Sequence, residues 1–160
     1  MMKNATLVFL IKRDGGKITQ ICLAMKKRGF GVNRWNGVGG KIDEGETVEQ
    51  AAIREAKEEI DVDVKDLDKV AEIDFTFPHK PEWNQIVYAY LCEKWTGEPT
   101  ESEEMSPKWF EVNKLPYKEM WPDDIFWLPQ VIEGKKLKAK FVFGEGDTVL
   151  EKEVDIVKGF

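Results

Sequence analysis

The first third of the chain alternates apolar runs with glycine-containing turns. Residues 5–11, ATLVFLI, form one continuous apolar run, and residues 18–25, ITQICLAM, form another. Between them lies Asp14-Gly15-Gly16, and glycines permit the positive φ angles that tight hairpin turns need. This pattern predicts a hairpin of two buried strands.

Strand signals return in the middle and at the end of the chain. Residues 70–77 and 85–95 read as two strands around the turn PHKPEWN. Residues 137–157 read as a last hairpin that turns at Gly144 to Gly146. Strands therefore flank the helical segments of the chain on both sides.

A first helix is predicted after a glycine-rich loop. Thr47 and Gln50 have the spacing of a capping box, so the helix is expected to start there and to run to about Ile60. With about 100° between successive residues, a core-facing stripe falls within one arc. This stripe consists of Ala52, Ile53, Ala56 and Ile60.

A second helix is predicted near residues 124–134, and the elements together indicate a mixed α/β (α+β) protein. Six Trp and nine Phe in a chain that is 34% charged indicate an ordered core beneath a solvated surface. No internal repeat or low-complexity linker divides the 160 residues. We therefore expect one domain, 1–160.

The first predicted helix also carries a cluster of acids. Glu55, Glu58 and Glu59 lie at positions i, i+3 and i+4, on one side of the helix. Like charges at this spacing cost about 0.2–0.5 kcal/mol per pair, which Arg54 offsets only in part. A hard divalent cation would reverse the sign of this energy, because it prefers oxygen ligands. The alternative is a solvated acidic face without a ligand.

Charge and residue usage exclude several classes of function. The net charge of −6 argues against a nucleic-acid polymer as partner, because such binding neutralises phosphates with Lys and Arg. The N-terminal apolar stretch is too short for a membrane span and lacks a signal-peptide cleavage pattern, so we expect a cytoplasmic protein. Cys22 and Cys92 read as small buried residues. His79 lies in a predicted turn and is expected to be exposed, not catalytic.

The segment GGKIDEGETVEQAAIREAKEEIDV, residues 39–62, resembles the Nudix box of the Nudix hydrolases, G-x5-E-x7-R-E-U-x-E-E-x-G-U, with the box spanning 40–62. The residues in register are Gly40, Glu46, Arg54, Glu55, Glu58, Glu59 and Val62. Ala56 is smaller than the usual aliphatic residue, and Asp61 replaces the late glycine. Asp tolerates the left-handed conformation, so we expect a modified helix exit with intact chemistry. The resemblance implies the Nudix fold, a mixed β-sheet sandwiched between α-helices.

The resemblance further implies that water, activated beside bound metal, attacks a nucleoside diphosphate linkage. Glu59 would activate the water, while Glu46 and Arg54 would orient the loop and the carboxylates. The implied ligands of Mg²⁺, or of Mn²⁺, are a backbone carbonyl of Gly39 or Gly40 and the side chains of Glu55, Glu58, Glu59 and Glu104. Read without the resemblance, Glu104 is an exposed acid on a surface loop.

Three further segments extend the resemblance over nearly the whole chain: MKKRGFGVNRWNGVGGK, ESEEM and KEMWPDDIFW. They look like the oxidised-purine nucleoside triphosphatase branch, the MutT-related 7,8-dihydro-8-oxoguanine triphosphatases of animals. By this likeness Asn36, Asp123 and Asp124 would bind the polar edge of a purine, and Trp121 would stack on its face. The other implied pocket residues are Thr6, Lys26, Phe30, Phe75, Phe77 and Trp127. Burial and mutual repulsion would keep one of the paired acids protonated near neutral pH.

Several of these residues also have plainer interpretations. Asp123 and Asp124 could cap the helix that begins there. Phe75 and Phe77, two apart on a strand, are ordinarily core residues. Lys26 belongs to a basic run that is usually solvated.

Three functions stay open at this point. The first is a pyrophosphohydrolase that cleaves oxidised purine nucleoside triphosphates to monophosphate and pyrophosphate, acting as a monomer in nucleotide-pool sanitation. The second is the same chemistry on ADP-ribose, a dinucleoside polyphosphate or an undamaged nucleotide, and the third is a non-catalytic nucleotide-binding module. The WPDD segment favours the first. The branch carries Met where this chain has Asn84 or Gln85, so we expect a more polar pocket.

Overall fold

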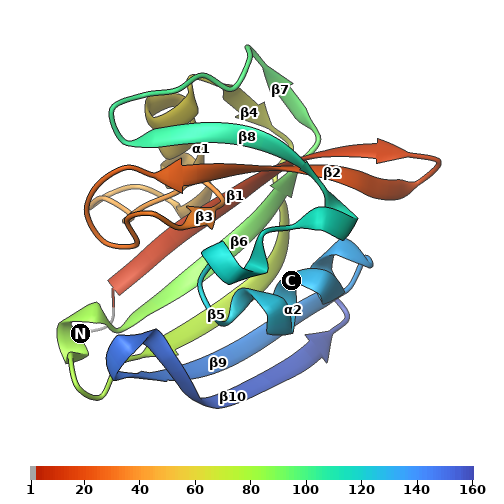
Figure 1. Cartoon of the computed structure of the whole chain (residues 1–160). Coiled ribbons are helices and arrows are strands. Elements are labelled where there is room, and N and C mark those ends of the chain that lie inside the picture. The colour runs from red at the N-terminus through yellow and green to blue at the C-terminus, as the bar shows by residue number, and fades with distance from the viewer. Residues whose placement is uncertain (1–2) are drawn as a thin grey trace.

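The computed structural model of the protein describes residues 3–160, which are built around one large β-sheet (Figure 1). Its strands and those of a smaller sheet are β1 (Lys3–Asp14), β2 (Lys17–Lys26), β3 (Trp35–Asn36), β4 (Asp63–Lys65), β5 (Asp68–Thr76), β6 (Gln85–Cys92), β7 (Lys94–Thr96), β8 (Met105–Glu111), β9 (Lys136–Gly144) and β10 (Thr148–Val157). The α-helices within this range are α1 (Val48–Ile60) and α2 (Asp124–Ile132).

The large sheet is mixed, as the sequence predicted. Its strand order is β10-β9-β5-β6-β1-β2-β3, and β8 pairs with the free side of β2. The pairs β1–β6 and β5–β9 are parallel, and the other pairs are antiparallel. In this register Phe75 of β5 lies opposite Gln85 of β6 on one side and Phe141 of β9 on the other.

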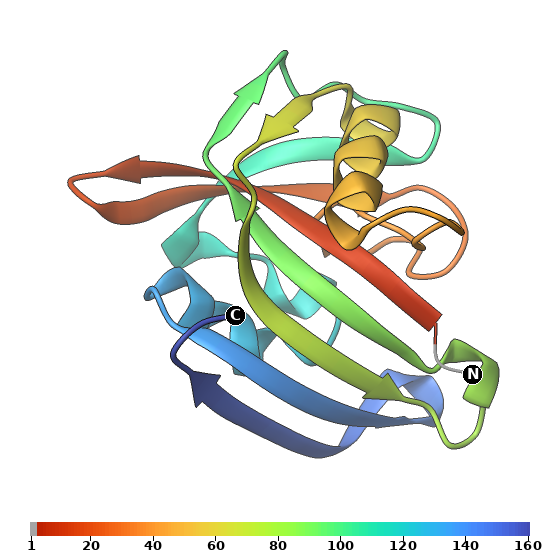
Figure 2. The same cartoon turned by 180° about the vertical axis from the view of Figure 1, so that it is seen from behind.

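Successive residues of β1 point to opposite faces of the sheet, as strand geometry requires. Val8 and Leu10 lie in an apolar cluster with the buried face of α1. Phe9 and Ile11 lie in a second, larger cluster with Trp127 of α2. Figures 1 and 2 show the two helices on opposite sides of the sheet. The predicted sandwich of a sheet between helices is therefore confirmed.

The predicted ends of α1 are confirmed as well. The side chain of Thr47 accepts the Gln50 N–H at 3.1 Å, and the Gln50 side chain accepts the Thr47 N–H at 2.8 Å, which completes the capping box. Asp61 adopts a left-handed conformation, φ 58° and ψ 42°, and donates its N–H to the Lys57 carbonyl at 3.1 Å. The chain thus leaves the helix through Asp where the motif has glycine.

The prediction of the core-facing stripe on α1 is wrong for one residue. Ile53 is 43% exposed and lies outside the core. The buried residues of the helix are Ala51, Ala52, Ala56, Glu59 and Ile60. The helix is rotated so that its acidic side, and not the side bearing Ile53, turns toward the glycine-rich loop. Glu59 therefore occupies a core-facing position.

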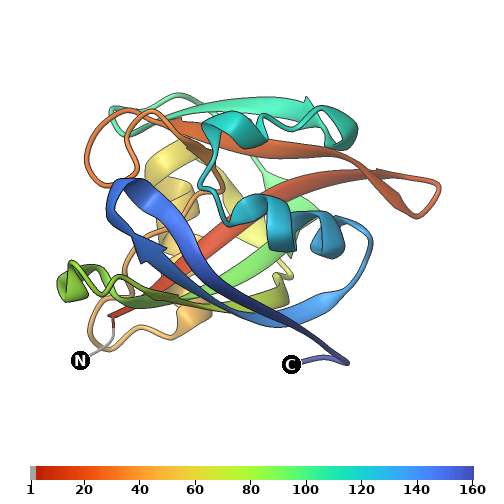
Figure 3. The ribbon, with the colours of Figure 1, turned by 60° about the horizontal axis from the view of Figure 1, so that its bottom comes forward.

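The other differences concern short strands and turns. The strand predicted over residues 85–95 ends at Cys92, because Lys94–Thr96 leave the large sheet and pair with β4. The strands β3, β4 and β8 were not predicted, since two of them are very short and β8 contains a proline and polar residues. The C-terminal hairpin is confirmed and turns through Glu145–Asp147. Figure 3 shows this turn near the loop that follows β2.

The cysteines and the histidine can be located in the structure. Cys22 and Cys92 are free and buried, and burial raises the pKa of Cys22 to about 12. His79 is exposed. Among residues 3–160, no helix is both long enough and apolar enough to cross a membrane.

Candidate active site

The glycine-rich loop before α1 lies directly against the backbone of β1. The Thr6 N–H donates to the Gly40 carbonyl at 2.9 Å. A Cβ atom at Gly39 would lie 1.8 Å from the Thr6 carbonyl oxygen, and one at Gly40 would lie 2.8 Å from the Glu55 carboxylate. Gly39 therefore requires glycine, which allows close approach of the backbone to its neighbours, whereas a side chain at Gly40 would displace the Glu55 carboxylate. The loop backbone and the acids of α1 meet here.

Glu59 is the most deeply buried acid of α1, with 4% of its surface exposed. Its Oε1 accepts the Gly39 N–H at 2.8 Å. Burial raises the pKa of Glu59 to about 7, against the effect of the Gly39 hydrogen bond. The Glu55 and Glu104 carboxylates raise this pKa further, and Lys26 lowers it. A carboxyl group with such a pKa can exchange a proton near neutral pH, as a general base must.

Arg54 is the centre of an ion-pair network between the loop and the helix. Its Nε and Nη2 bind the two carboxylate oxygens of Glu46 at 2.8 and 3.0 Å, and Nη2 also donates to the Lys41 carbonyl at 3.1 Å. Its Nη1 lies 2.8 Å from Glu55 and 3.3 Å from Glu58. The hydrogen bonds with Arg54 lower the pKa of Glu46. Arg54 thus fixes the loop and orients two of the helix acids.

Glu104 reaches this region from the segment before β8. Its carboxylate accepts hydrogen bonds from Arg28 Nε at 2.8 Å and Nη2 at 2.5 Å. Across residues 3–160, no three His, Cys, Asp or Glu side chains form a ready-made metal site. Arg28 and Arg54 hold Glu104 and Glu55 in ion pairs, so the implied ligands do not converge on one point.

The donors themselves fit a hard divalent cation. The acids of α1 offer only oxygen atoms, which Mg²⁺ and Mn²⁺ prefer. Beside the Glu55 carboxylate, the missing side chain of Gly40 leaves space that a Cβ would fill. The buried Glu59 carboxylate borders the same loop through Gly39. A cation bound here would compete with Arg54 for the Glu55 oxygens.

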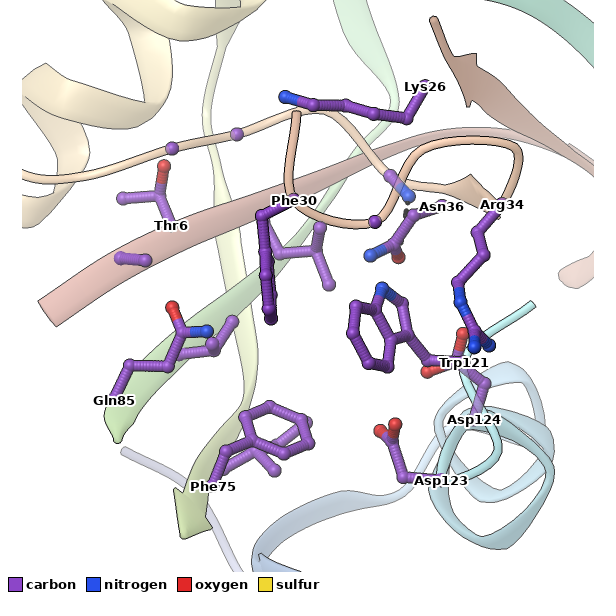
Figure 4. A pocket seen from close by; sticks show the side chains of 18 of the residues that line it. Thr6, Lys26, Phe30, Arg34, Asn36, Phe75, Gln85, Trp121, Asp123 and Asp124 are labelled. Carbon is purple, nitrogen blue, oxygen red and sulfur yellow. Dashed lines mark hydrogen bonds between the residues drawn. The ribbon is translucent and has the colours of Figure 1, made fainter. Parts of the chain in front are cut away.

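A cavity of about 310 Å³ opens on the other side of the glycine-rich loop (Figure 4). All ten residues that the resemblance implied for substrate binding line it: Thr6, Lys26, Phe30, Asn36, Phe75, Phe77, Trp121, Asp123, Asp124 and Trp127. Gly39 and Gly40 line it too, so the cavity extends to the loop against which the helix acids lie.

Asp123 and Asp124 lie at the start of α2 and are 1% and 3% exposed. Trp127 donates its indole N–H to Asp123 Oδ2 at 2.8 Å. Three other buried oxygens have no hydrogen-bond partner within residues 3–160: Thr6 Oγ1, Asp123 Oδ1 and Asp124 Oδ2. Each unpaired buried polar group costs about 1–3 kcal/mol. Asp123 and Asp124 can share a hydrogen bond between their carboxyl groups when one of them is protonated, so the cavity offers a polar ligand the Thr6 hydroxyl and one buried acid pair.

The two buried acids share a perturbed titration. Burial raises the pKa of Asp123 to about 6, against the opposing hydrogen bond from Trp127. Burial and then the neighbouring Asp123 charge raise the pKa of Asp124 well above its ordinary value. Arg34 acts in the opposite direction on both groups. The pair therefore holds one proton near neutral pH, so that one acid donates a hydrogen bond while the other accepts.

The structure argues against helix capping by the acid pair and supports core packing of the two phenylalanines. Asp123 is the N-cap residue of α2, yet no side-chain hydrogen bond caps the helix, so capping does not explain the pair. Phe77 is 2% exposed and belongs to the core cluster, while Phe75 packs against that cluster. Both phenylalanines also line the cavity, as does Lys26. The two phenylalanines therefore belong to the hydrophobic core and to the cavity wall at the same time.

Of the two residues expected near the position that departs from the branch, Gln85 lies at the cavity. Its side chain lines the cavity, and Figure 4 shows its amide directed toward the space between Thr6 and Phe75. Asn84 instead uses its side-chain oxygen to accept the Phe77 N–H at 2.7 Å. Gln85 is therefore the one of the two residues that can add a polar group to the cavity wall.

Sequence reasoning missed several residues of the cavity wall. These include Leu7, Gly31, Arg34, Ile73, Val87, Met105 and Phe143. The position of Arg34 in NRWNG, two residues before Asn36, could have indicated it. Phe143 had no local signal, because only the pairing of β9 with β5 brings it to Phe77, where the ring centroids are 5.3 Å apart.

The sheet between two helices, the glycine-rich loop on β1 and the acids of α1 are together the architecture of a Nudix hydrolase. The NUDIX domain matches residues 1–131, and the chain belongs to this family. It is 45% identical to the oxidized purine nucleoside triphosphate hydrolase of Mus musculus over 139 residues, covering 85% of this chain and 88% of that protein.

Two further relatives extend the comparison. The oxidized purine nucleoside triphosphate hydrolase of Danio rerio is 42% identical over 156 residues, covering 98% of this chain and 96% of that protein. Among solved structures, the mutator MutT protein of Bacillus halodurans superposes with a TM-score of 0.82 over 96% of this chain and 98% of its own. At 20% identity this structural likeness shows the shared fold alone.

Proposed function

We propose that the protein is a metal-dependent pyrophosphohydrolase that cleaves oxidised purine nucleoside triphosphates, such as 8-oxo-dGTP and 2-hydroxy-dATP, to nucleoside monophosphate and pyrophosphate. The observation that carries this proposal is the aromatic cavity with three unpaired buried oxygens, on Thr6, Asp123 and Asp124. The names of the Mus musculus and Danio rerio relatives support it. Such an enzyme removes damaged nucleotides before they enter DNA.

The cavity suits a purine for a physical reason. A purine is flat with a polar edge, so aromatic rings cover its faces while a few fixed donors and acceptors bind the edge. In the proposal Trp121 stacks on the base, and the acid pair supplies one donor and one acceptor. Asn36 Oδ1 accepts the Gly37 N–H at 2.8 Å, which orients the amide and leaves its NH₂ group as a further donor. Exchange of the proton between Asp123 and Asp124 would accommodate both oxidised bases.

The phosphates are proposed to lie over the glycine-rich loop. A divalent ion would be held by Glu55, Glu58, Glu59, a carbonyl of Gly39 or Gly40, and Glu104; we propose Mg²⁺, with Mn²⁺ as a substitute. Such an ion, when bound, neutralises phosphate oxygens and lowers the pKa of water. Glu59 accepts a proton from the attacking water in this proposal, and its burial beside the Gly39 N–H holds the carboxylate in a fixed position for that role.

The basic side chains have supporting roles in the same proposal. Arg54 and Glu46, bound to each other by two hydrogen bonds, hold the loop and position the helix acids. Lys26 lines the cavity and is close enough to lower the pKa of Glu59. It therefore lies between the base cavity and the helix acids, where it can bind a phosphate or the sugar.

A product-release assay across a nucleotide panel tests the proposal. With Mg²⁺, kcat/KM is expected to be highest for 8-oxo-dGTP and 2-hydroxy-dATP, lower for dGTP, and lowest for ADP-ribose and dinucleoside polyphosphates. A preference for ADP-ribose would refute the proposed substrate but not the proposed metal-dependent hydrolysis. Nucleotide binding without turnover in Mg²⁺ or Mn²⁺ would instead indicate a binding module.

The proposal includes a monomeric enzyme in the cytoplasm that acts on free nucleotides and not on nucleic-acid polymers. The free thiols of Cys22 and Cys92 are usual for a reducing compartment. The net charge of −6 opposes binding to polymeric phosphate backbones. Sedimentation, cell fractionation and a single-stranded DNA mobility shift would test the three statements separately.

A further inference from the structure

Arg34 joins three segments around the base cavity. Its Cζ lies 4.4 Å from the centroid of the Trp121 ring, and its Nη1 donates to the Met120 carbonyl at 3.0 Å. Its Nη2 pairs with Asp147 Oδ2 at 2.8 Å. Arg34 belongs to the loop after β2, Met120 and Trp121 precede α2, and Asp147 lies in the turn between β9 and β10 (Figure 3). One side chain thus connects parts of the chain that are far apart in sequence.

These contacts leave Arg34 few alternative orientations. The side chains of Arg34 and Asp147 are only 26% and 27% exposed, so water screens their ion pair incompletely. A planar guanidinium that makes directed hydrogen bonds and also lies on a ring is held in one geometry, which a lysine cannot reproduce. Figure 4 shows Arg34 beside Trp121, at the wall of the cavity.

The wall itself has space behind it. Arg34 and Trp121 line the base cavity, and both also line a second hollow that is bordered by Val32, Trp83 and Asp147. Without the guanidinium, the indole ring of Trp121 could tilt toward this second hollow. The orientation of the ring therefore depends on Arg34 as well as on its own packing.

We propose that Arg34 is a positioning residue for base recognition: it fixes the Trp121 ring in the cavity wall and anchors the segment before α2 to Asp147. This inference rests on the proposed function, because Trp121 is the ring proposed to stack on the purine. The guanidinium has a second effect, since its charge favours ionisation of the acid pair of α2. Loss of Arg34 leaves that pair protonated to a higher pH.

The test compares Arg34→Gln, Arg34→Lys and Asp147→Asn with the wild type, using 8-oxo-dGTP and Mg²⁺. Arg34→Gln is expected to raise KM about three- to thirtyfold, the range of one partly buried cation–π contact, while kcat changes less than about twofold. Arg34→Lys restores part of the loss through its charge. Asp147→Asn has a smaller effect because the guanidinium remains. Arg13→Gln, which removes an exposed pair with Glu93 outside the cavity, is the matched control.

A pH profile separates positioning from general support of the fold. Arg34→Gln is expected to move the alkaline limb of kcat/KM to higher pH, whereas Asp147→Asn moves it less. An unchanged KM and pH profile in Arg34→Gln would overturn the inference. So would a loss confined to kcat with a lowered melting temperature.

The proposed function can fail independently, and its failure shows in the wild type as absence of turnover of oxidised purine nucleotides. In that case the affinity for 8-oxo-dGMP, measured by calorimetry without metal, tests the positioning role of Arg34. Weaker binding to Arg34→Gln than to Arg13→Gln supports the positioning role, and equal binding refutes it.

Discussion

Asp123→Asn is the substitution that most directly probes the base cavity. In the wild type, Asp123 Oδ2 accepts the Trp127 N–H at 2.8 Å, and Oδ1 has no partner within residues 3–160. Asn keeps an acceptor for Trp127 and places an NH₂ group where Oδ1 was. The substitution therefore preserves volume and fixes a donor toward the cavity. It abolishes the exchange of one proton between Asp123 and Asp124.

The size of the effect follows from the burial of the pair. Asp123 is 1% exposed, so a hydrogen bond to the base there does not compete with bulk water. A hydrogen bond to a charged group is worth about 1.5–3 kcal/mol, and each 1.4 kcal/mol or so is tenfold. Asp123→Asn is thus expected to lower kcat/KM for 8-oxo-dGTP roughly ten- to a hundredfold. Stability should stay level or rise, since no side-chain cap is lost and a buried charge is removed.

The assay measures kcat/KM of Asp123→Asn and Asp124→Asn on 8-oxo-dGTP, 2-hydroxy-dATP and dGTP, with melting temperature as the control. Base recognition by the pair requires that the ranking of the three substrates changes. Small losses of equal size on all three would refute the reasoning and leave a Nudix hydrolase whose base selectivity lies elsewhere. A large fall in melting temperature would show that the pair supports the fold instead.

Three further predictions concern other parts of the site. Glu59→Gln should lower kcat at least about a hundredfold without loss of thermal stability, and near-wild-type turnover at saturating Mg²⁺ would exclude Glu59 as the base. In metal-free protein, the raised pKa values of Glu59, from 4.5 to about 7, and Asp123, from 3.8 to about 6, mean that the folded state binds more protons. The two acids stabilise the folded state fully at a pH below their pKa values in the unfolded chain, and this stabilisation disappears as the pH rises through their pKa values in the folded protein. The melting temperature should therefore decline less between pH 4 and pH 8 for Glu59→Gln than for the wild type. Gln85→Met should change the ratio of kcat/KM between 8-oxo-dGTP and 2-hydroxy-dATP, and an unchanged ratio would remove Gln85 from base recognition.

Local signals in the sequence were sufficient for much of the fold. The capping box at Thr47 and the left-handed exit at Asp61 were predictable because each depends on a few neighbouring residues. Ile53 was placed wrongly for a different reason. Helical periodicity decides which residues share an arc, but the rotation of α1 against the sheet depends on what the loop and β1 present to it. That rotation buries Glu59 and exposes Ile53.

The candidate site also contains residues that local sequence motifs identify and residues whose roles depend on contacts across the fold. The acids of α1 and the pair on α2 belong to contiguous motifs, so their residue types and spacing were readable from the sequence. Phe143 was not, because its role in the cavity wall arises from its contact with Phe77 across the fold, and the sequence near Asn36 could indicate Arg34 but not its pairing with Asp147. Pairing of distant strands and turns leaves no trace in a short window of sequence.

Thr6 links the two ends of the candidate site. Its N–H binds the Gly40 carbonyl, and its own carbonyl abuts Gly39, whose N–H binds Glu59. Its Oγ1 is one of the three unpaired oxygens of the base cavity. The backbone of a single buried residue therefore holds the base-binding wall and the proposed hydrolytic acids in a fixed relative position. Because small misplacements of reacting groups cost large factors in rate, a base that binds in a shifted position against Thr6 would also misplace its phosphates, and discrimination against such a base would appear in kcat as well as in KM. Weaker stacking on Trp121, as in Arg34→Gln, leaves the contact with Thr6 in place and is expected to act on KM.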